Sequence, residues 1–577
     1  MAYNNNYRKG YHTNSSNGVA EDFYNPYAFV GLHNLVWHLN DEELQELSMI
    51  QDAPVRDGYS GKIKVDFKAL TPFCVKGADG NGVNTDGHYF VPGTSLKGMI
   101  RSVFEIMTYS NIRNGIANNR YSMRNLNSPD YELKKNNPQL SGFLVQINGD
   151  LFVQECYSMP YRYFDKKDHE DIASFAKFKS GKSSRDLEQA KSVEEKYSVL
   201  KTPFLDLEEG AMGMWFFSGF MQNKKHEFLF EIPEFDMTEM IPLQGTEYED
   251  FIFIHEKENE NASWKFWKRR LKNYSSVQQI AEDGYRGIVP CFFRINQQGT
   301  AVRDLGFSYL YRQPYPKRIH DFLPEQLRGQ GIDLAQAVFG YVNGSDALRG
   351  RVQVGNAFIE CAKPISEQTF VLGGPKPSFF PFYLEQNNPD KMANYFSENT
   401  IISGYKRFLL RDQAEEGKKN KSKVTSSFYP LAAGTEFSTV ITFHNLHDYE
   451  LGALLAAITF CRQNDRCYHS LGYAKPFGYG KMQVKSCEMS LERDGLDEGG
   501  LIDAFFDKLC KTCQRSKKDW DSDMSYLFLI ASGKYNPTKP IRYPKMKDAQ
   551  SGQTANEFVE INKAKLEMSN FSPKNRQ

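Results

Sequence analysis

The stretch KIKVDFKALTPF (residues 62–73), followed by VPGTSLKGMIRSVFEIM (residues 91–107), decides the fold. In residues 62–70 apolar and polar side chains alternate, which is typical of a strand with one buried face. From Leu96 to Met107 apolar residues recur every three or four positions, as in an amphipathic helix, and Thr94 or Ser95 is expected to cap its N-terminus. We therefore predict a strand, a glycine-containing loop and a helix, in this order.

A second strand–helix unit is predicted near the C-terminus. In residues 437–443 every second residue belongs to one buried face, and residues 451–458 have the apolar spacing of a helix, with Asn445 as its expected cap. The segment LGYAKPFGYGKMQV (residues 471–484) then reads as a glycine-rich turn that enters a strand. Two such units with β-like sequence between them predict an α+β fold: a ferredoxin-like sheet whose halves are separated by a long insertion.

Length and composition narrow the class of protein. The chain has 577 residues, of which 40% are hydrophobic, so it is long enough for several globular units and is not a disordered chain. The 71 basic and 71 acidic residues balance, so nucleic-acid binding requires a local patch. No apolar run is long enough to cross a membrane, and nine scattered cysteines suit the reducing cytoplasm. We expect a cytoplasmic protein, with Cys510 and Cys513 packed rather than bound to metal.

Two motifs carry residues suited to RNA. At residues 91–101, a helix N-terminus opened by Gly93 can hold a phosphate with its free N–H groups, and Lys97 and Arg101 add charge. In residues 472–481, the glycines permit close backbone approach, two lysines supply charge, and Tyr473, Phe477 and Tyr479 offer rings for stacking on bases. An ordinary capped helix and an ordinary glycine hairpin are the alternatives. The phosphate-loop spacing G-x-x-x-x-G-K-[ST] is missing here, so an ATPase is unsupported.

These motifs, in this order, resemble the RAMP superfamily of CRISPR-associated proteins. Residues 91–101 look like the family's "PG-S-S-L-K-G-x-x-R" helix, and residues 472–484 like its C-terminal glycine-rich loop. Between them, VFG (residues 338–340) and LRGRVQV (residues 348–354) are similar to the "F-G … G-R-V" segment of backbone subunits. The most similar relatives are the long RAMP proteins of type III systems, either one heavily inserted RAMP protein or two fused RAMP modules.

The resemblance implies an RNA-recognition-motif-like fold that binds CRISPR RNA, holds the guide and the guide–target duplex in antiviral defence, and assembles with other subunits of a type III effector. Further segments that mix aromatic and cationic residues lie at 307–318, 373–380 and 403–410, although each alone is also typical of a packed strand with exposed cations. The expected RNA-binding residues are Gly93, Thr94, Ser95, Lys97, Arg101, Tyr311, Arg312, Lys317, Arg318, Lys376, Lys406, Arg407, His469, Gly472, Lys475, Gly478, Gly480 and Lys481. The expected partners are CRISPR RNA, target RNA and other effector subunits, with no membrane.

The resemblance also leaves an endoribonuclease open. Subunits of this superfamily often cut target RNA with an Asp in the loop before the helix, and here that loop holds Asp79 and Asp86 without the usual "D-x-P" context. Asp86-Gly87 is also a common turn dipeptide. For processing of precursor RNA, the possible general bases are His88, His320 and His469. RNA binding requires no cofactor, whereas a metal-assisted nuclease would need Mg²⁺. A scaffold that contacts only protein is the third alternative.

Six segments are predicted along the chain. They are an N-terminal arm and lead-in (1–60), the first half of the ferredoxin-like core (61–110), an inserted β-rich region that could be a second module (111–285), a middle β-rich region (286–435), the C-terminal half of the core with the glycine-rich loop (436–490), and a helical, basic tail (491–577).

Overall fold

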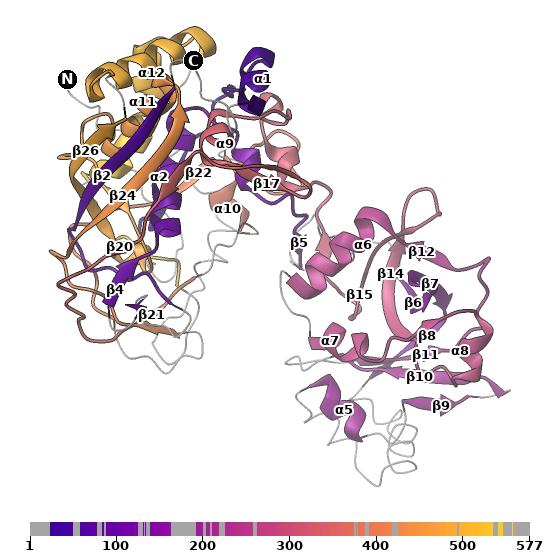
Figure 1. Cartoon of the computed structure of the whole chain (residues 1–577). Helices are drawn as coiled ribbons and strands as arrows, with labels where there is room; N and C mark the ends of the chain where they lie inside the picture. Colours follow the sequence, from indigo (N-terminus) through magenta and orange to yellow (C-terminus); the bar gives the residue numbers. More distant parts are fainter. Residues whose placement is uncertain are drawn as a thin grey trace. The chain divides into compact units, whose positions relative to one another are not determined.

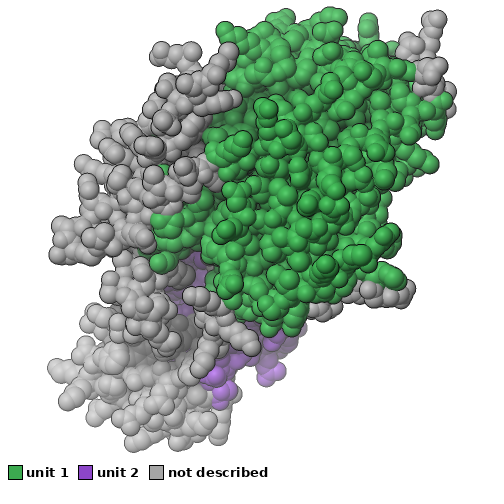
Figure 2. Space-filling model, turned by 90° about the vertical axis from the view of Figure 1, so that its left-hand side faces the viewer, with its two compact units in different colours: residues 1–117, 320–577 green, residues 118–319 purple. Residues whose placement is uncertain are grey.

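A computed structural model of the chain divides into two compact units, residues 1–117 with 320–577 (unit 1) and residues 118–319 (unit 2), which Figure 2 shows in green and purple. The residues that the structure describes are 23–49, 58–77, 84–85, 88–124, 131, 133, 139–162, 192–199, 203–207, 210–218, 226–257, 262–373, 377, 379–386, 392–417, 425–492, 495–534, 540–545 and 557. The six segments predicted from the sequence stay predictions.

The core of unit 1 is an antiparallel sheet in the order β19 (Val352–Val354), β24 (Glu436–Leu446), β2 (Tyr59–Ala69), β26 (Lys481–Leu491) and β25 (His469–Ser470). Along the chain, β2 precedes α2 (Gly93–Met107), β19 and β24 precede α11 (Asp448–Thr459), and β26 follows. The β-α-β-β-α-β order, with the first strand between the third and the fourth, is the ferredoxin-like arrangement. This confirms the predicted fold, and Figure 1 shows its central strands β2 and β24 side by side.

The periodicities that predicted these elements define the buried core. Ile63, Val65 and Phe67 of β2 are fully buried, whereas Lys62 and Lys64 are exposed on the other face. On α2 the predicted apolar stripe, Leu96, Met99, Ile100, Val103, Phe104 and Met107, is buried in the same cluster. Helix α11 is buried on nearly every side because α12 (Glu498–Cys513) also packs against it. Gly452 permits this contact, since a Cβ there would lie 1.9 Å from the Leu501 carbonyl oxygen.

Both predicted helix caps are wrong. Helix α2 begins at Gly93 after Pro92 and has no side-chain cap from Thr94 or Ser95. The Asn356 side-chain oxygen accepts the Gly93 N–H at 2.8 Å instead. Helix α11 begins after His447, whose N–H donates to the Glu450 carboxylate at 2.9 Å, while Asn445 has a φ of 54°. Distant or neighbouring groups therefore replace the caps that local sequence favoured.

The remaining elements of unit 1 are short and surround this core. The paired strands are β1 (Tyr27–Val30) with β22 (Tyr405–Phe408), β3 (Asn84–Thr85) with β4 (His88–Val91) and β20 (Ala357–Phe358), β17 (Tyr341–Asn343) with β18 (Asp346–Leu348), and β21 (Gln368–Val371) with β23 (Thr425–Phe428). The helices are α1 (Asp41–Met49), α9 (Leu334–Phe339), α10 (Phe380–Tyr383), α13 (Lys517–Asp523) and α14 (Ser525–Ser532). The 3₁₀ turns are Ile112–Gly115, Ile319–Phe322, Glu325–Leu327 and Lys475–Phe477.

Unit 2 contains two sheets joined by aromatic packing. One has the order β12 (Ile241–Leu243), β7 (Asp150–Cys156), β6 (Leu140–Ile147), β14 (Val289–Ile295) and β15 (Val302–Gly306), with β13 (Asn273–Tyr274) beside β6. The other has the order β8 (Ser158–Arg162), β11 (His226–Glu231), β10 (Met212–Phe216) and β9 (Phe204–Asp206). Phe216 and Phe230 of the second sheet meet Phe292 of the first edge-to-face.

Short helices complete unit 2: α5 (Val193–Val199), α6 (Gly245–Ile252), a π-helical segment (Phe253–Lys257), α7 (Ala262–Lys268) and α8 (Gln278–Glu282), together with a β5 (Ser122–Met123) and β16 (Gln313–Pro314) pair. In the described part of the chain, no helix has both the length and the apolar character needed to cross a bilayer.

Candidate nucleic-acid interface

The glycine-rich loop between β25 and β26 is held tightly against the sheet. Gly472, Gly478 and Gly480 have φ values of 84°, 85° and 82°. A Cβ at Gly472 would lie 2.4 Å from the Cys74 carbonyl oxygen, and one at Gly480 would lie 1.9 Å from that of Leu471. The N–H groups of Tyr473 and Gly480 donate to the carbonyls of Cys74 and Pro72, at 2.8 and 2.9 Å. The loop therefore has one defined path, which requires glycine.

The aromatic residues of this loop pack inward. Phe477 stacks on Phe370 with ring centroids 4.2 Å apart, and Tyr473 meets Phe428 edge-to-face. Tyr479 is buried, and its hydroxyl donates to the Glu415 carbonyl at 3.0 Å. These rings anchor the loop to the β21–β23 hairpin, and in this structure they form part of an apolar cluster.

The loop brings Lys475 near Arg407 of β22, although both are cations. Burial, followed by the charge of Arg407, lowers the pKa of Lys475 to about 8. Burial also lowers the pKa of Arg407 to about 10, and its guanidinium donates to the Ser102 hydroxyl of α2 at 2.8 Å. Among the described residues no carboxylate forms an ion pair with either side chain. We call Ser102, Arg407 and Lys475 the loop cationic site.

His469 lies beside this site but inside the core. It is 1% exposed, and its Nε2 lies 2.8 Å from the Ile458 carbonyl oxygen. Burial, with a smaller contribution from the charge of Arg407, lowers the pKa of His469 to about 4. The ring is therefore neutral at physiological pH, and among the described residues its buried Nδ1 has no hydrogen-bond partner.

Two further predicted cations have partners of their own. Lys406 lies 3.8 Å from the ring centroid of Tyr27 and donates to the Tyr383 hydroxyl at 2.7 Å, and burial lowers its pKa to about 8. Lys481 is buried, lies over the Tyr468 ring and pairs with Asp412 at 2.7 Å. An aromatic enclosure thus stabilises the first and a carboxylate the second.

The cations of α2 bind backbone carbonyls. Lys97 donates to the Phe339 carbonyl at 3.2 Å, and Arg101 donates to the Gly340 carbonyl at 3.1 Å and to Glu105 at 2.7 Å. Both carbonyls lie at the C-terminus of α9, where positive charge is favourable. Lys97 and Arg101 therefore attach the "F-G" segment to α2.

Arg351 of the "G-R-V" segment is a buried structural residue that the sequence reasoning did not single out. It is 4% exposed, forms a bidentate ion pair with Glu450 and donates to the Asn445 carbonyl at 2.9 Å. It also donates to the Ala337 carbonyl at 3.2 Å, so one side chain joins α9, β24 and α11. The only signal in the sequence is an arginine at the start of an apolar strand.

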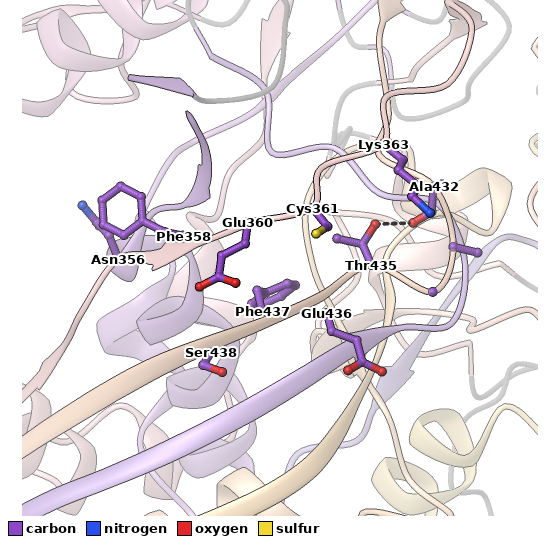
Figure 3. A pocket seen from close by; sticks show the side chains of 12 residues that line it. Asn356, Phe358, Glu360, Cys361, Lys363, Ala432, Thr435, Glu436, Phe437 and Ser438 are labelled. Atoms are coloured by element: carbon purple, nitrogen blue, oxygen red, sulfur yellow. Dashed lines mark hydrogen bonds between the residues drawn. The ribbon is translucent and has the colours of Figure 1, made fainter. Parts of the chain in front are cut away.

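An open pocket of about 800 Å³ lies beside the first residues of β24. Asn356, which bonds the Gly93 N–H, lines this pocket together with the exposed Phe358 ring, and Figure 3 shows Glu360 and Glu436 around it. Thr94 is exposed and Ser95 is half-buried. An amide oxygen thus accepts the first helical N–H, and the pocket is lined by the carboxylates of Glu360 and Glu436 and by the ammonium group of Lys363.

Comparison with known families identifies the chain. The family model of the RAMP superfamily matches residues 66–483, which extend from β2 to β26. The chain belongs to the RAMP superfamily. A search of curated proteins gives no match.

The structure comparison finds a chain of the "Cryo-EM structure of the Type III-B Cmr-beta bound to cognate target RNA", with 9% sequence identity. The match covers 75% of this chain and 98% of that chain, with a TM-score of 0.18. A likeness at this level carries no argument about this RAMP protein.

The predicted RNA-binding residues of unit 2 lie apart from the RAMP motifs in the sequence, and Tyr311 and Arg318 bind carboxylates of the same unit. Tyr311 is 2% exposed, and its hydroxyl donates to Asp304 at 2.5 Å. Arg318 pairs with Asp250 at 2.9 Å, while Arg312 and Lys317 are half-buried. Lys376 lies outside the described residues.

The nuclease candidates of this RAMP protein are not brought together in the described part of the chain. Asp79 and Asp86 lie outside the described residues. His88 is exposed on β4, and His320 has its Nε2 3.0 Å from the Ile116 carbonyl oxygen.

Burial raises the pKa of Cys513, at the end of α12, to about 12, so it remains a thiol. The described residues contain no group of three or more His, Cys, Asp or Glu side chains placed to hold a metal ion.

Proposed function

We propose that this chain is a CRISPR RNA-binding subunit of a type III effector complex, in the cytoplasm, and that it holds guide RNA and the guide–target duplex. The proposal rests on membership of the RAMP superfamily and on one observation, the loop cationic site. Its ligands are then CRISPR RNA and target RNA, and its protein partners are the other subunits.

The loop cationic site has the chemistry of a phosphate site. Burying a cation without an anionic partner is unfavourable, which is why the pKa values of Lys475 and Arg407 are lowered. A phosphate oxygen supplies the missing charge, and the Arg407 guanidinium offers the planar donors that bind phosphate well. The Ser102 hydroxyl holds that guanidinium in place.

The rigidity of the loop supports the same function. Glycines at positive φ and three inward-packed rings define the backbone path of the loop at Lys475 before any ligand arrives. A preformed site loses little conformational entropy on binding. RNA-binding proteins use such cationic positions to follow the backbone of a single strand.

The test is to express the chain with its neighbouring genes and a CRISPR array, purify it and sequence the RNA that remains bound. We expect repeat-tagged guide RNAs with the wild-type chain. The double variant Lys475→Gln/Arg407→Gln should lose them, whereas Lys511→Gln, which removes an exposed cation on α12, should retain them. RNA-free wild-type protein without affinity for repeat RNA would overturn the proposal.

A further inference from the structure

Unit 2 carries a dense group of cations that lies outside the RAMP motifs. Helix α7 and the residues after it read ASWKFWKRRLK (residues 262–272), with five cations and no acidic residue. The five cations are exposed, whereas the aromatic rings Trp264, Phe266 and Trp267 are buried beneath them. We call Lys265, Lys268, Arg269, Arg270 and Lys272 the α7 basic cluster.

Carboxylates neutralise only part of this cluster. Lys268 pairs with Glu256 at 2.7 Å, and Lys272 pairs with Asp283 at 2.7 Å. Arg269 and Arg270 form no ion pair with any described residue. The helix dipole favours Lys265 and Lys268 in the last turn of α7, but it does not account for two further arginines beyond that turn.

Arg270 also lies against an aromatic ring. Its guanidinium lies 3.7 Å from the ring centroid of Phe266, and Tyr197 stacks on the same ring at 5.0 Å with an interplanar angle of 10°. The Tyr197 hydroxyl donates to the Trp215 carbonyl at 2.6 Å, so the stack is anchored in the sheet. The guanidinium lies over this ring, and a planar guanidinium with its fork of N–H donors is suited to bidentate contact with a phosphate.

The character of the surface favours a polyanion over a protein. Protein interfaces place aromatic or apolar anchors at their centre. Here the rings are buried, and charge is what the cluster presents to solvent. A nucleic-acid backbone requires only positioned cations, and release of its counterions supplies the free energy.

From this geometry we propose that the α7 basic cluster is a second RNA-binding surface, on the inserted unit, in which Arg269 and Arg270 contact phosphates of the RNA backbone. The proposal rests on the proposed function, because the RNA is the one that the effector holds. It extends that function to a surface independent of the glycine-rich loop and of the RAMP motifs.

The experiment measures the affinity of the full chain for a guide RNA at several salt concentrations. Wild type is compared with Arg269→Gln, Arg269→Gln/Arg270→Gln, Lys475→Gln and the exposed control Lys511→Gln. For a single strand, the slope of log K against log salt changes by about 0.7 for each phosphate contact. We expect the slope to fall by about 0.7 in the single cluster variant and about 1.4 in the double variant. The control should match wild type.

Folding is followed by thermal unfolding, because loss of the Arg270–Phe266 contact can destabilise α7. Arg269→Gln has no such contact to lose and keeps the test valid if the double variant unfolds. Cross-linking of 4-thiouridine RNA should also label the peptide that contains residues 262–272.

The outcomes separate the two proposals. If wild type and Lys475→Gln differ in affinity but the cluster variants match wild type in affinity and slope, the second surface is wrong and the proposed function stands. If wild type binds no RNA, both are overturned. If the cluster variants keep RNA but lose a partner subunit, the cluster is a protein interface and this inference is also wrong.

Discussion

The cations of helix α2 and those of the loop cationic site arise from similar motifs but are bound differently. Lys97 and Arg101 donate to carbonyls at the end of α9, and a carboxylate also binds Arg101. Lys475 and Arg407 are half-buried, and the hydrogen bond of Arg407 is to a neutral hydroxyl. The fold thus supplies acceptors for the α2 cations, whereas the proposal leaves the charge of the loop cationic site to be met by RNA.

The largest expected effect concerns the most completely paired cation, Arg351. Burial raises the pKa of Glu450, but the charge and hydrogen bonds of Arg351 outweigh burial, so the net pKa is lowered. Arg351→Ala leaves a buried carboxylate without its partner, and we expect the free energy of unfolding to fall by about 3–5 kcal/mol. Urea unfolding measures this loss. An unchanged midpoint would contradict a structural role.

The next effect tests the loop cationic site. Lys475→Gln removes a charge that the RNA phosphate is proposed to bind, and we expect guide-RNA affinity to fall about tenfold, or about 1.4 kcal/mol. Because folding lowers the pKa of Lys475 from 10.5 to about 8, the charged side chain reduces stability fully below pH 8, and this cost disappears as the pH rises toward 10.5. At neutral pH the variant should therefore unfold at a slightly higher temperature. If Lys475→Gln instead lowers the free energy of unfolding and leaves RNA affinity unchanged, Lys475 is a structural cation and does not bind the RNA phosphate.

A smaller effect is expected in α2. Lys97→Gln loses the hydrogen bond to the Phe339 carbonyl, and the free energy of unfolding should fall by about 1 kcal/mol. Guide-RNA affinity should remain unchanged in filter-binding assays. A variant that keeps its stability but binds RNA more weakly would place Lys97 with the functional cations.

The smallest effect is the dependence of binding on pH. Lys475 has a pKa of about 8 in the free protein, whereas Arg407 stays charged to about pH 10. RNA affinity is therefore expected to fall by about fivefold between pH 7 and pH 9, as Lys475 loses its proton. Lys406 also has a pKa of about 8, so a fall in affinity near pH 8 does not by itself identify Lys475, and variants of both lysines are compared. The fall should vanish in Lys475→Gln and persist in Lys406→Gln.

Much of the fold could be predicted from local sequence patterns. The alternation in β2 and the apolar stripe of α2 predicted the buried face that the structure confirms. The helix caps were not readable, because the group that caps α2 is Asn356, 263 positions from Gly93. Local propensity favours Thr94 and Ser95 but carries no information about a distant amide.

The candidate site shows the same limit. Lys475 was predicted from the glycine-rich motif and Arg407 from the aromatic and cationic segment 403–410. The effect of one charge on the other and the hydrogen bond to Ser102, 305 positions from Arg407, depend on tertiary structure. The burial of Tyr311 and His469 could not be predicted from the sequence either. The α7 basic cluster is present in the sequence as WKFWKRRLK, but it matches no RAMP motif, so the resemblance gives it no role. The RNA contacts stay predictions.

The placement of the insertions also affects synthesis of the chain. The Asp66 carboxylate of β2 accepts hydrogen bonds from Ser438 of β24 and Ser486 of β26, which follow it by 372 and 420 positions. At a translation rate of about 5–20 residues per second, the central strand leaves the ribosome roughly 20–80 s before either partner exists. Unit 2 is continuous in sequence and complete much earlier. The apolar faces of the first strand and helix of the RAMP core therefore remain without their sheet partners during this interval.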